Sequence, residues 1–370
     1  MNRIEPDVMA LMNTWTARFA GFLFLLAALT GRLPAAPTFA GEEGAMDKPF
    51  FKEQLIFDEI PGYPSCHGST VTELPGGALF AAWYAGAAEK ATDVAIFCSR
   101  LAPGAEKWSS PEILHDAPGL SEGNPVLFAD GDGRVWFFYV VMYGSTWNDC
   151  KVHYRTSDDE GKTWSGENTL IGQKGWMTRN HPLILNDGTF ILPIYNEVLF
   201  TPGFILTTDG GKTWKKTGIN LRAGGGIIQP SSVQLSDGAI LAYMRTGAKE
   251  GFIMKTVSTD GGEKWSSPEP TAFPNPNAAV DLARLRDGSL VLIYNDSFYD
   301  RTPLSAALST DEGKTWTFKR DLEKTFGEFS YPSLIQSRDG VIHVTYTYKR
   351  TNIKHAAFNK EWIMQKPYKK

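Results

Sequence analysis

The chain has 370 residues, and its 37 Lys and Arg against 41 Asp and Glu give a formal net charge of −4. No basic stripe is available to neutralise a phosphate backbone, so a nucleic acid is not expected as a partner. The 22 Phe, 13 Tyr, 11 Trp and 36 Gly, without a long segment of helical periodicity, are typical of many short aromatic-rich strands joined by tight turns.

The first forty residues differ in composition from the rest of the chain. Two arginines precede an apolar run over residues 19–29, and a stretch of small residues ends at Ala40. This order is typical of a cleaved secretory signal. The run is shorter than the roughly 20 residues that a single membrane anchor requires. We therefore expect a signal peptide over 1–40, one domain over 41–370, a secreted or periplasmic location, and no stable membrane insertion after cleavage.

A short turn phrase recurs six times along the rest of the chain. In five copies it is Asp-Gly and in the first it is Gly-Gly, each time followed by alternating apolar residues. The glycine that ends each pair is Gly77, Gly133, Gly188, Gly238, Gly288 or Gly340, and successive copies are 50 to 56 residues apart. Such pairs favour tight hairpins because both central turn positions need a positive φ. The spacing predicts six similar units, each opening with a hairpin.

A second phrase, Ser/Thr-x-Asp-x-Gly-x-x-Trp, follows four of these hairpins. The copies are 157–164, 207–214, 258–265 and 309–316, and a fifth, from Ser99 to Trp108, lacks the Asp. We expect a structural role: the Asp accepts hydrogen bonds from its own turn, the Gly supplies an unusual conformation, and the Trp packs between sheets. A Ca²⁺ site is disfavoured, since one carboxylate per turn is far from the six to eight oxygens that Ca²⁺ requires.

Six units of about 55 residues, each long enough for four short strands, predict an all-β, six-bladed β-propeller with Asp-box turns. A linear solenoid is the alternative. The first unit lacks a complete turn motif and the last has none, which favours a ring whose final sheet is completed from both ends of the chain. With three cysteines, a disulfide framework is not expected, although one pair can still form.

In a propeller, functional residues are expected at one phase of the repeat, beside the central channel. The polar residues just before the first strands are His67, Glu122, Asn124, Arg179, His181, Gln229, Asn277, Asp281, Glu328 and Tyr331. Those just after the second strands are Tyr84, Tyr143, Tyr195, Glu197, Arg245, Asp296 and Arg350. Cationic, carboxylic and aromatic side chains converging in one pocket suit an acidic carbohydrate.

On these motifs the sequence resembles the sialidase superfamily, specifically its Asp-box (bacterial neuraminidase repeat) proteins, over essentially all of 41–370. Sialidases hold the substrate carboxylate with three arginines, use a Tyr nucleophile activated by a Glu, and use an Asp as acid/base. The resemblance implies that Arg245 is the second arginine, Arg301 the third, and Tyr331 in Tyr331-Pro332-Ser333-Leu334 the nucleophile.

The sequence departs from the sialidase pattern in three places. Cys66-His67-Gly68 replaces the motif of the first arginine, and Gln229 stands where the activating Glu is expected, sixteen residues before Arg245. An amide cannot take a proton from Tyr331, so Glu328 and Asp281 are the candidates for its base. No evident acid/base Asp is present in the first unit, where Glu89 is the nearest carboxylate and Asp93 lies four residues on.

The sequence thus predicts a secreted sialidase-like glycoside hydrolase that removes a terminal acidic sugar from glycans, as an exo-alpha-sialidase or a related exo-glycosidase. The expected catalytic residues are Tyr331, Glu89, His67, Glu328 and Asp281. The expected substrate-binding residues are Arg245, Arg301, Arg179, His181, Gln229, Glu197, Asp296 and Arg350.

Two other functions remain open at this stage. One is a polysaccharide lyase on uronate-containing glycans, in which His67 or His181 works with a Tyr. The other is a carbohydrate-binding propeller without catalysis. No cofactor is expected, and no metal, because the six His are dispersed without a recognised ligand spacing. We expect a monomer.

Overall fold

The computed structural model describes residues 48–219, 226–248 and 251–365. The chain divides into two units, 1–41 and 42–370, and every strand belongs to the second. The predicted signal peptide, with its cleavage point near Ala40, lies outside the described residues. Within the described residues, no helix is long and apolar enough to cross a bilayer.

The described residues form six antiparallel sheets, five of which follow chain order. The first holds β2 (Ser65–Glu73), β3 (Leu79–Gly86), β4 (Ala95–Leu101) and β5 (Glu112–His115), and the second β6 (Ser121–Ala129), β7 (Val135–Met142), β8 (Cys150–Ser157) and β9 (Asn168–Ile171). The third holds β10 (Trp176–Thr178), β11 (Leu183–Ile184), β12 (Phe190–Asn196), β13 (Thr201–Thr207) and β14 (Lys215–Gly218). The fourth holds β15 (Ile227–Gln234), β16 (Ile240–Thr246), β17 (Gly251–Ser258) and β18 (Glu269–Asn275), and the fifth β19 (Asp281–Arg284), β20 (Leu290–Asn295), β21 (Leu304–Ser309) and β22 (Phe318–Glu323).

The sixth sheet joins the two ends of the propeller. It holds β23 (Phe329–Gln336), β24 (Ile342–Tyr348) and β25 (Asn352–Phe358), and β1 (Phe51–Leu55) adds its outer strand by pairing with β25. A short helix α1 (Lys360–Met364) follows, and its Trp362 stacks on Phe51 with ring centroids 4.5 Å apart. The prediction that the final sheet takes strands from both ends of the chain is confirmed.

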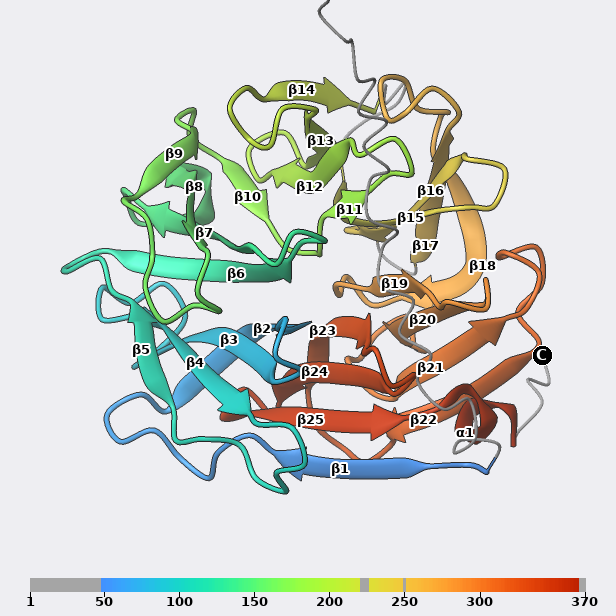
Figure 1. Ribbon diagram of the computed structural model, residues 1–370, viewed down its shortest axis with the longest axis horizontal. Helices are drawn as coiled ribbons and strands as arrows, with labels where there is room; N and C mark the ends of the chain where they lie inside the picture. Colours follow the sequence, from blue (N-terminus) through green and yellow to red (C-terminus); the bar gives the residue numbers. More distant parts are fainter. Residues whose placement is uncertain (1–47, 220–225, 249–250, 366–370) are drawn as a thin grey trace, which may run out of the picture. The chain divides into compact units, whose positions relative to one another are not determined.

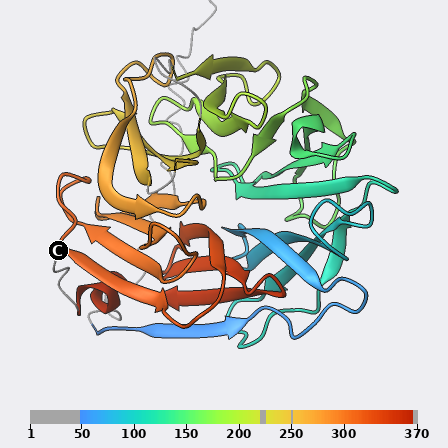
Figure 2. The same ribbon diagram turned by 180° about the vertical axis from the view of Figure 1, so that it is seen from behind.

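The sheets are arranged in a ring, with one strand of each beside the central axis (Figure 1; Figure 2 from behind). Strand β2 packs against both β6 and β23, which closes the circle, so the six-bladed propeller is confirmed and the linear solenoid is wrong. All eight residues of β3, and all eight of β7, are buried. Middle strands are buried because each sheet is covered on both faces by its neighbours.

The six hairpins form where predicted, but only the final glycine of each pair has a positive φ, so the expectation of a positive φ at both central turn positions is wrong. These final glycines all have φ between +85° and +94°. In the third hairpin, Gly188 N donates to Leu185 O and Leu185 N to Thr189 O, a turn that needs one left-handed residue.

In the Asp box at 157–164, Asp159 accepts hydrogen bonds from the backbone N–H of Lys162 and Thr163, and the Gly161 N–H donates to Ser157 Oγ at 2.7 Å. Hydrogen bonds led by that of Thr213 lower the pKa of Asp209 to about 2. These aspartates therefore stabilise turns.

The tryptophans of the Asp boxes pack between sheets, as expected. Trp265 of the fourth sheet stacks on Phe204 of the third with ring centroids 4.0 Å apart. Cys66, Cys98 and Cys150 all lie within the described residues, and each is buried and unpaired, so the disulfide that the sequence left open does not form. The ring is held together by apolar packing between sheets.

Candidate functional site

The central channel has two mouths of different construction. The innermost strands β2, β6, β15, β19 and β23 all begin at one end, which also receives the ends of the second strands; we call this end the loop mouth. The Asp-Gly hairpins and the Asp boxes lie at the opposite end, which we call the hairpin mouth. The repeat phase identified in the sequence corresponds to the loop mouth.

The inner strands are bulged close to the loop mouth. Strand pairing shifts register after His67, Gly123, Ile228 and Ser330. In three of these bulges a residue with positive φ precedes a proline, as Asn124 (φ 43°), Gln229 (φ 56°) and Tyr331 (φ 55°). A bulge re-aims a side chain locally. A polar residue before a proline in an inner strand therefore marks a position where the bulge changes the direction of the side chain. The three pairs are Asn124-Pro125, Gln229-Pro230 and Tyr331-Pro332.

Tyr331 lies among arginines. Arg245 Nη1 donates to Tyr331 Oη at 2.8 Å, and the guanidinium carbons of Arg245 and Arg301 are 5.9 and 5.5 Å from its ring centroid. Burial acts to raise the pKa of Tyr331, but the charges of Arg245 and Arg301 outweigh it and hold the pKa below its ordinary value. This environment stabilises a phenolate, or negative charge near it.

Gln229 links two tyrosines across the channel. Its Nε2 donates to Tyr195 Oη at 3.1 Å and approaches Tyr331 Oη at 3.4 Å, while its Oε1 accepts from Arg245 Nη1 at 3.1 Å. Asn124 Nδ2 also donates to Tyr195 Oη, at 2.9 Å. Both protein neighbours of Tyr331 Oη are thus donors, so neither can act as its base.

His67 lies against Tyr331, with ring centroids 4.1 Å apart, and its Nδ1 shares a hydrogen bond of 2.8 Å with Thr347 Oγ1. Burial, followed by the charges of Arg350 and Arg301, lowers the pKa of His67 well below its ordinary value, which keeps the imidazole neutral. The next residue must be glycine: Gly68 has φ +66°, and a Cβ there would stand 2.7 Å from the ring of Tyr84.

Arg350 provides a cation where the sequence lacks the first arginine of the sialidase pattern. It lies in the hairpin between β24 and β25, and the Cys66 N–H donates to its carbonyl oxygen at 2.7 Å. Its Nε donates to Glu328 Oε1 at 2.8 Å, and Arg301 Nη1 donates to the same oxygen at 2.7 Å. The fold therefore gathers three arginines, Arg245, Arg301 and Arg350, at the loop mouth.

Three carboxyl groups accompany these arginines. Glu89 accepts from Arg350 Nη1 at 2.7 Å and from Trp147 Nε1 at 3.0 Å. Burial acts to raise the pKa of Glu328, but the two arginines that it contacts outweigh it and lower the pKa. Glu197 follows β12, and its pKa is raised, chiefly by burial. Trp147, which holds Glu89 in place, was not identified from the sequence because it lies inside a loop, outside the repeat phase.

Two residues predicted to act at this site serve the backbone or an outer strand. Arg179 is buried, and its guanidinium donates to the carbonyl oxygens of Ser69, Tyr331 and Pro332. It therefore holds the backbone beside Tyr331 in place. Asp296 forms an ion pair with Lys319 of the outer strand β22. The assignment of Arg179 to substrate binding is corrected accordingly, and that of Asp296 stays a prediction.

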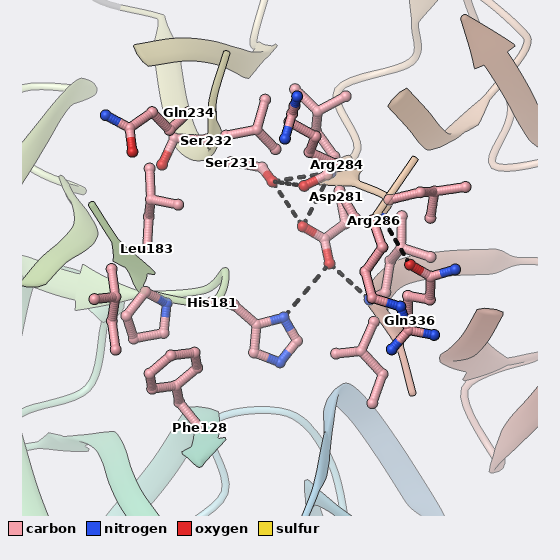
Figure 3. Close-up of a pocket in the computed structure, with 18 of the residues that line it drawn as sticks. Phe128, His181, Leu183, Ser231, Ser232, Gln234, Asp281, Arg284, Arg286 and Gln336 are labelled. Atoms are coloured by element: carbon pink, nitrogen blue, oxygen red, sulfur yellow. Dashed lines mark hydrogen bonds and ion pairs between the residues drawn. The ribbon is translucent and has the colours of Figure 1, made fainter. Parts of the chain in front are cut away.

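His181 and Asp281 line a cavity together with the hairpin residues Asn186, Ser236 and Arg286, and Figure 3 shows His181 facing the Asp281 carboxylate. Asp281 accepts from Leu334 N and Ser231 Oγ, both at 2.7 Å, and His181 Nδ1 is 3.9 Å from its Oδ2. The cavity has a volume of about 620 Å³, and Tyr331 does not line it. The assignments of Asp281 as the base for Tyr331 and of His181 to substrate binding are corrected, because Tyr331 and the arginines around it lie at the loop mouth, whereas this cavity opens at the other end.

Glu122, also in the predicted phase, faces away from the channel and pairs with His115. The other predicted residues meet at the loop mouth: Tyr331, His67, Glu89, Glu328, Arg245, Arg301, Arg350, Gln229 and Glu197. In the described part of the chain, no group of three or more His, Cys, Asp or Glu side chains is arranged to hold a metal ion.

Comparison with known proteins agrees with this architecture. The family model described as BNR repeat-like domain matches residues 77–344. The chain belongs to this family, within the sialidase superfamily. It is similar to a sialidase of Micromonospora viridifaciens, with 24% identity over 391 residues, covering 91% of this chain and 58% of the relative. It is also similar to an anhydrosialidase of Macrobdella decora, with 23% identity over 247 residues, covering 59% and 32%. The chain thus spans less than two thirds of the length of either curated relative.

Solved structures share the propeller. A Hadza microbial sialidase superposes with a TM-score of 0.69 at 17% identity, covering 80% of this chain and 66% of that one. The intramolecular trans-sialidase from Ruminococcus gnavus gives 0.69 at 16%, covering 83% and 97%. A protein of unknown function from Dyadobacter fermentans gives 0.71 at 15%, covering 84% and 99%. At these low identities, the likeness to the three structures shows that the BNR-repeat chain has the same fold.

Proposed function

We propose that this BNR-repeat propeller is a secreted glycoside hydrolase of the sialidase type that removes a terminal acidic sugar from glycans. The observation that carries the proposal is the convergence of Arg245 and Arg301 on Tyr331 at one mouth of the channel, with Arg350 joined to Arg301 through Glu328. Two arginines and the tyrosine match positions of the sialidase pattern. The leech intramolecular trans-sialidase, which shares the fold, has been solved in complex with 2,7-anhydro-Neu5Ac, a carboxylated sugar.

In the proposed complex the sugar carboxylate binds to the arginines. Guanidinium groups bind planar oxyanions through paired hydrogen bonds, and they keep their charge at every pH of interest. Arg301 and Arg350 both donate to Glu328, which orients their guanidinium planes before substrate arrives. Binding an anion here offsets the concentration of positive charge at the loop mouth.

Tyr331 acts on the anomeric carbon as nucleophile or as stabiliser of the developing cation. A tyrosine hydroxyl has an ordinary pKa of about 10, so it needs a base or a positive field to react at neutral pH. Gln229 cannot serve as that base. The hydrogen bond from Arg245 and the charge of Arg301 supply the field and lower the pKa of Tyr331. A neighbouring carboxyl group, Glu89 or another at the same mouth, transfers the proton of the leaving group.

A second candidate function rests on one specific contact. The neutral imidazole of His67 lies 4.1 Å from the ring of Tyr331, beside arginines that can neutralise a uronate carboxylate. A lyase uses such groups to remove the proton next to the carboxylate and to protonate the leaving oxygen, which breaks the C–O bond and leaves a double bond. Water is not consumed in that reaction.

A substrate screen separates these functions. The purified protein is incubated with sialosides, uronides, and plant or algal polysaccharides, and products are read by reducing ends and by ultraviolet absorbance. We expect a free acidic sugar without new absorbance. An absorbing unsaturated uronate would replace the hydrolase by the lyase. Glycan binding without turnover, unchanged by Tyr331→Phe, would instead identify a carbohydrate-binding propeller.

The proposed export and monomeric state are tested separately. Export depends on residues 1–40, so the full chain is expressed in a bacterial host and the N-terminal sequence of the exported protein is determined. A start near residue 41 in the periplasm or medium is expected, and retention of the intact chain in the cytoplasm contradicts export. Light scattering during size-exclusion chromatography should give the mass of one chain, and twice that mass contradicts the monomer.

A further inference from the structure

We propose that His67 donates a hydrogen bond from Nε2 to the carboxylate of the acidic sugar, and that Thr347 is the positioning residue that keeps the His67 hydrogen on that nitrogen. The inference rests on the proposed function and adds a carboxylate-binding residue that the sialidase pattern lacks. The hydrogen bonds of one buried hydroxyl group decide which nitrogen of the imidazole carries the hydrogen.

Thr347 of β24 lies against β2 of the first blade and has two polar neighbours there. Its Oγ1 accepts a hydrogen bond from Gly68 N at 3.2 Å and is 2.8 Å from His67 Nδ1. Thr347 is fully buried, and the described residues offer its hydroxyl group no third partner. A hydroxyl group has one hydrogen to donate, and a buried donor without an acceptor is costly. Thr347 therefore donates to Nδ1, which carries no hydrogen in the neutral ring.

The single hydrogen of the neutral imidazole is then on Nε2. Burial and the surrounding arginines lower the pKa of His67 well below its ordinary value, which agrees with a neutral ring. Only 2% of the His67 surface is exposed, yet Nε2 forms no hydrogen bond with any described residue. Nε2 is also not enclosed by protein, in contrast to the unpartnered Nε of Arg179. It therefore opens on the channel beside Tyr331 as a donor without an acceptor.

Two tyrosine rings hold the imidazole in place. The ring centroid of Tyr331 is 4.1 Å from that of His67, and the ring of Tyr84 meets the imidazole edge-on with centroids 5.6 Å apart. The bond to Thr347 fixes the remaining rotation of the ring. The direction of the free N–H is thus set before substrate arrives, so binding loses little side-chain freedom.

The acceptor that suits this donor is an anion. The guanidinium carbons of Arg301 and Arg245 are 5.5 and 5.9 Å from the centroid of the Tyr331 ring. His67 packs against the same ring, so its N–H and the two arginines share one small region. A neutral N–H adds a donor there without a further positive charge, and its hydrogen bond to a carboxylate is stronger than one to a neutral oxygen. The carboxylate of the acidic sugar is therefore its ligand.

The same hydrogen bonds limit what His67 does in a reaction. A ring nitrogen that carries a hydrogen cannot remove a proton, and the other ring nitrogen is occupied by Thr347. A lyase at this mouth would have to use Tyr331 as its base. His67 is thus a binding residue in either reaction.

Nitrogen NMR of the purified protein tests the tautomer without reference to turnover. Comparison with His67→Gln assigns the His67 signals among those of the six histidines. At neutral pH we expect a hydrogen on Nε2 and none on Nδ1, and the opposite result would overturn the inference. Addition of sialic acid, of glucuronic acid or of the acid that the wild type releases should shift the Nε2 signal to saturation, whereas glucose should not. No shift with any acid would also overturn it.

The role of Thr347 has a matched control in the same strand. Thr347→Val removes the hydroxyl group with little change in shape, and it should give a second set of His67 signals with the hydrogen on Nδ1. Thr345→Val is the control, since Thr345 is equally buried and its Oγ1 has no hydrogen-bond partner among the described residues. It should leave the His67 signals unchanged. A wild-type tautomer in Thr347→Val would overturn the positioning role.

Kinetics separate binding of the carboxylate from proton transfer. His67→Leu should raise KM for the acidic substrate by about 10- to 100-fold with little change in kcat, because a hydrogen bond to a charged group is lost from the bound substrate and the transition state alike. His67→Gln keeps an N–H donor and should raise KM less. A loss confined to kcat would overturn the inference and leave the proposed function standing. A wild type inactive on the whole substrate panel would overturn the proposed function, and the NMR titration would still decide whether His67 binds the acid.

Discussion

The two mouths of the channel are built from the same repeated unit, yet they use it in opposite ways. At the hairpin mouth the side chains bind the backbone of the preceding blade: Gln234 Oε1 accepts from Asn186 N, and Gln336 Oε1 accepts from Arg286 N. At the loop mouth, side chains of several blades meet one another around Tyr331, as Arg245 and Gln229 do. Repeated hydrogen bonds from side chains to backbone join neighbouring blades at one end, and the side chains that differ from blade to blade form the proposed site at the other.

Backbone strain follows the same division. Non-glycine residues with positive φ gather at the loop mouth, as Asn124, Gln229, Asn277, Tyr331 and Arg350. At the hairpin mouth most positive φ values belong to glycines, for which they cost little, and Glu160 and Glu312 of two Asp boxes are the exceptions. Strain in a non-glycine residue persists only where the surroundings impose it, and it often marks a functional site. We therefore expect substitutions at the loop mouth to impair function and substitutions at the hairpin mouth to impair stability.

The largest expected effect is at Tyr331. Tyr331→Phe removes the hydroxyl that accepts from Arg245, and kcat/KM on the acidic substrate should fall by about 10³-fold. The midpoint of thermal unfolding should stay close to that of the wild type. Tyr63→Phe, which alters a tyrosine packed on Phe97, is the control and should keep full activity. An active Tyr331→Phe protein would remove the loop mouth from the proposed chemistry.

The converse result is expected at Asp281. Asp281→Ala leaves Leu334 N and Ser231 Oγ without their buried acceptor, and it should lower the free energy of unfolding by about 2–4 kcal/mol. Urea unfolding measures this loss, while kcat/KM per folded molecule should remain unchanged. Asp281→Asn keeps one acceptor oxygen and should lose less. A selective loss of turnover in either variant would contradict the separation of the two mouths.

Arg350 tests the composition of the anion site. Arg350→Met removes a guanidinium from the loop mouth, and KM for the acidic substrate should rise about 10- to 30-fold, corresponding to about 1.4–2 kcal/mol for a charged hydrogen bond. Arg338→Met, which removes an arginine paired with Glu73 at the hairpin mouth, is the control and should leave KM unchanged. Similar KM values for the two variants would mean that Arg350 does not bind substrate.

The smallest effect concerns acid stability at an Asp box. The folded pKa of Asp209 is lowered to about 2, below an unfolded value of about 3.9. Its contribution to stability is therefore present above about pH 4 and is lost as the pH falls toward 2. Asp209→Asn should be less stable than the wild type at pH 6, and the difference should shrink by pH 2.5. Asp132→Asn is the control, and a pH-independent difference for Asp209→Asn would refute the linkage.

Several site residues were recognisable from the sequence because their signals are local. Arg245, Arg301 and Tyr331 stand in short motifs at fixed distances from turns, and the fold brings them together as expected. Asp281 stands near the same repeat phase and nevertheless faces the other mouth. Asp281 stands seven residues before the glycine of its hairpin, whereas Gln229 and Tyr331 stand nine before theirs, so Asp281 lies closer to the hairpin mouth along its strand.

The sequence by itself determined the six units, their hairpins and their Asp boxes, because each depends on hydrogen bonds and torsion angles within a few residues. Only the tertiary structure decided that Arg350 stands beside Cys66, where a sialidase would carry its first arginine. It also decided that Arg179 binds backbone carbonyls. Both outcomes depend on ring closure, which brings the last blade against the first and sets contacts between residues hundreds of positions apart.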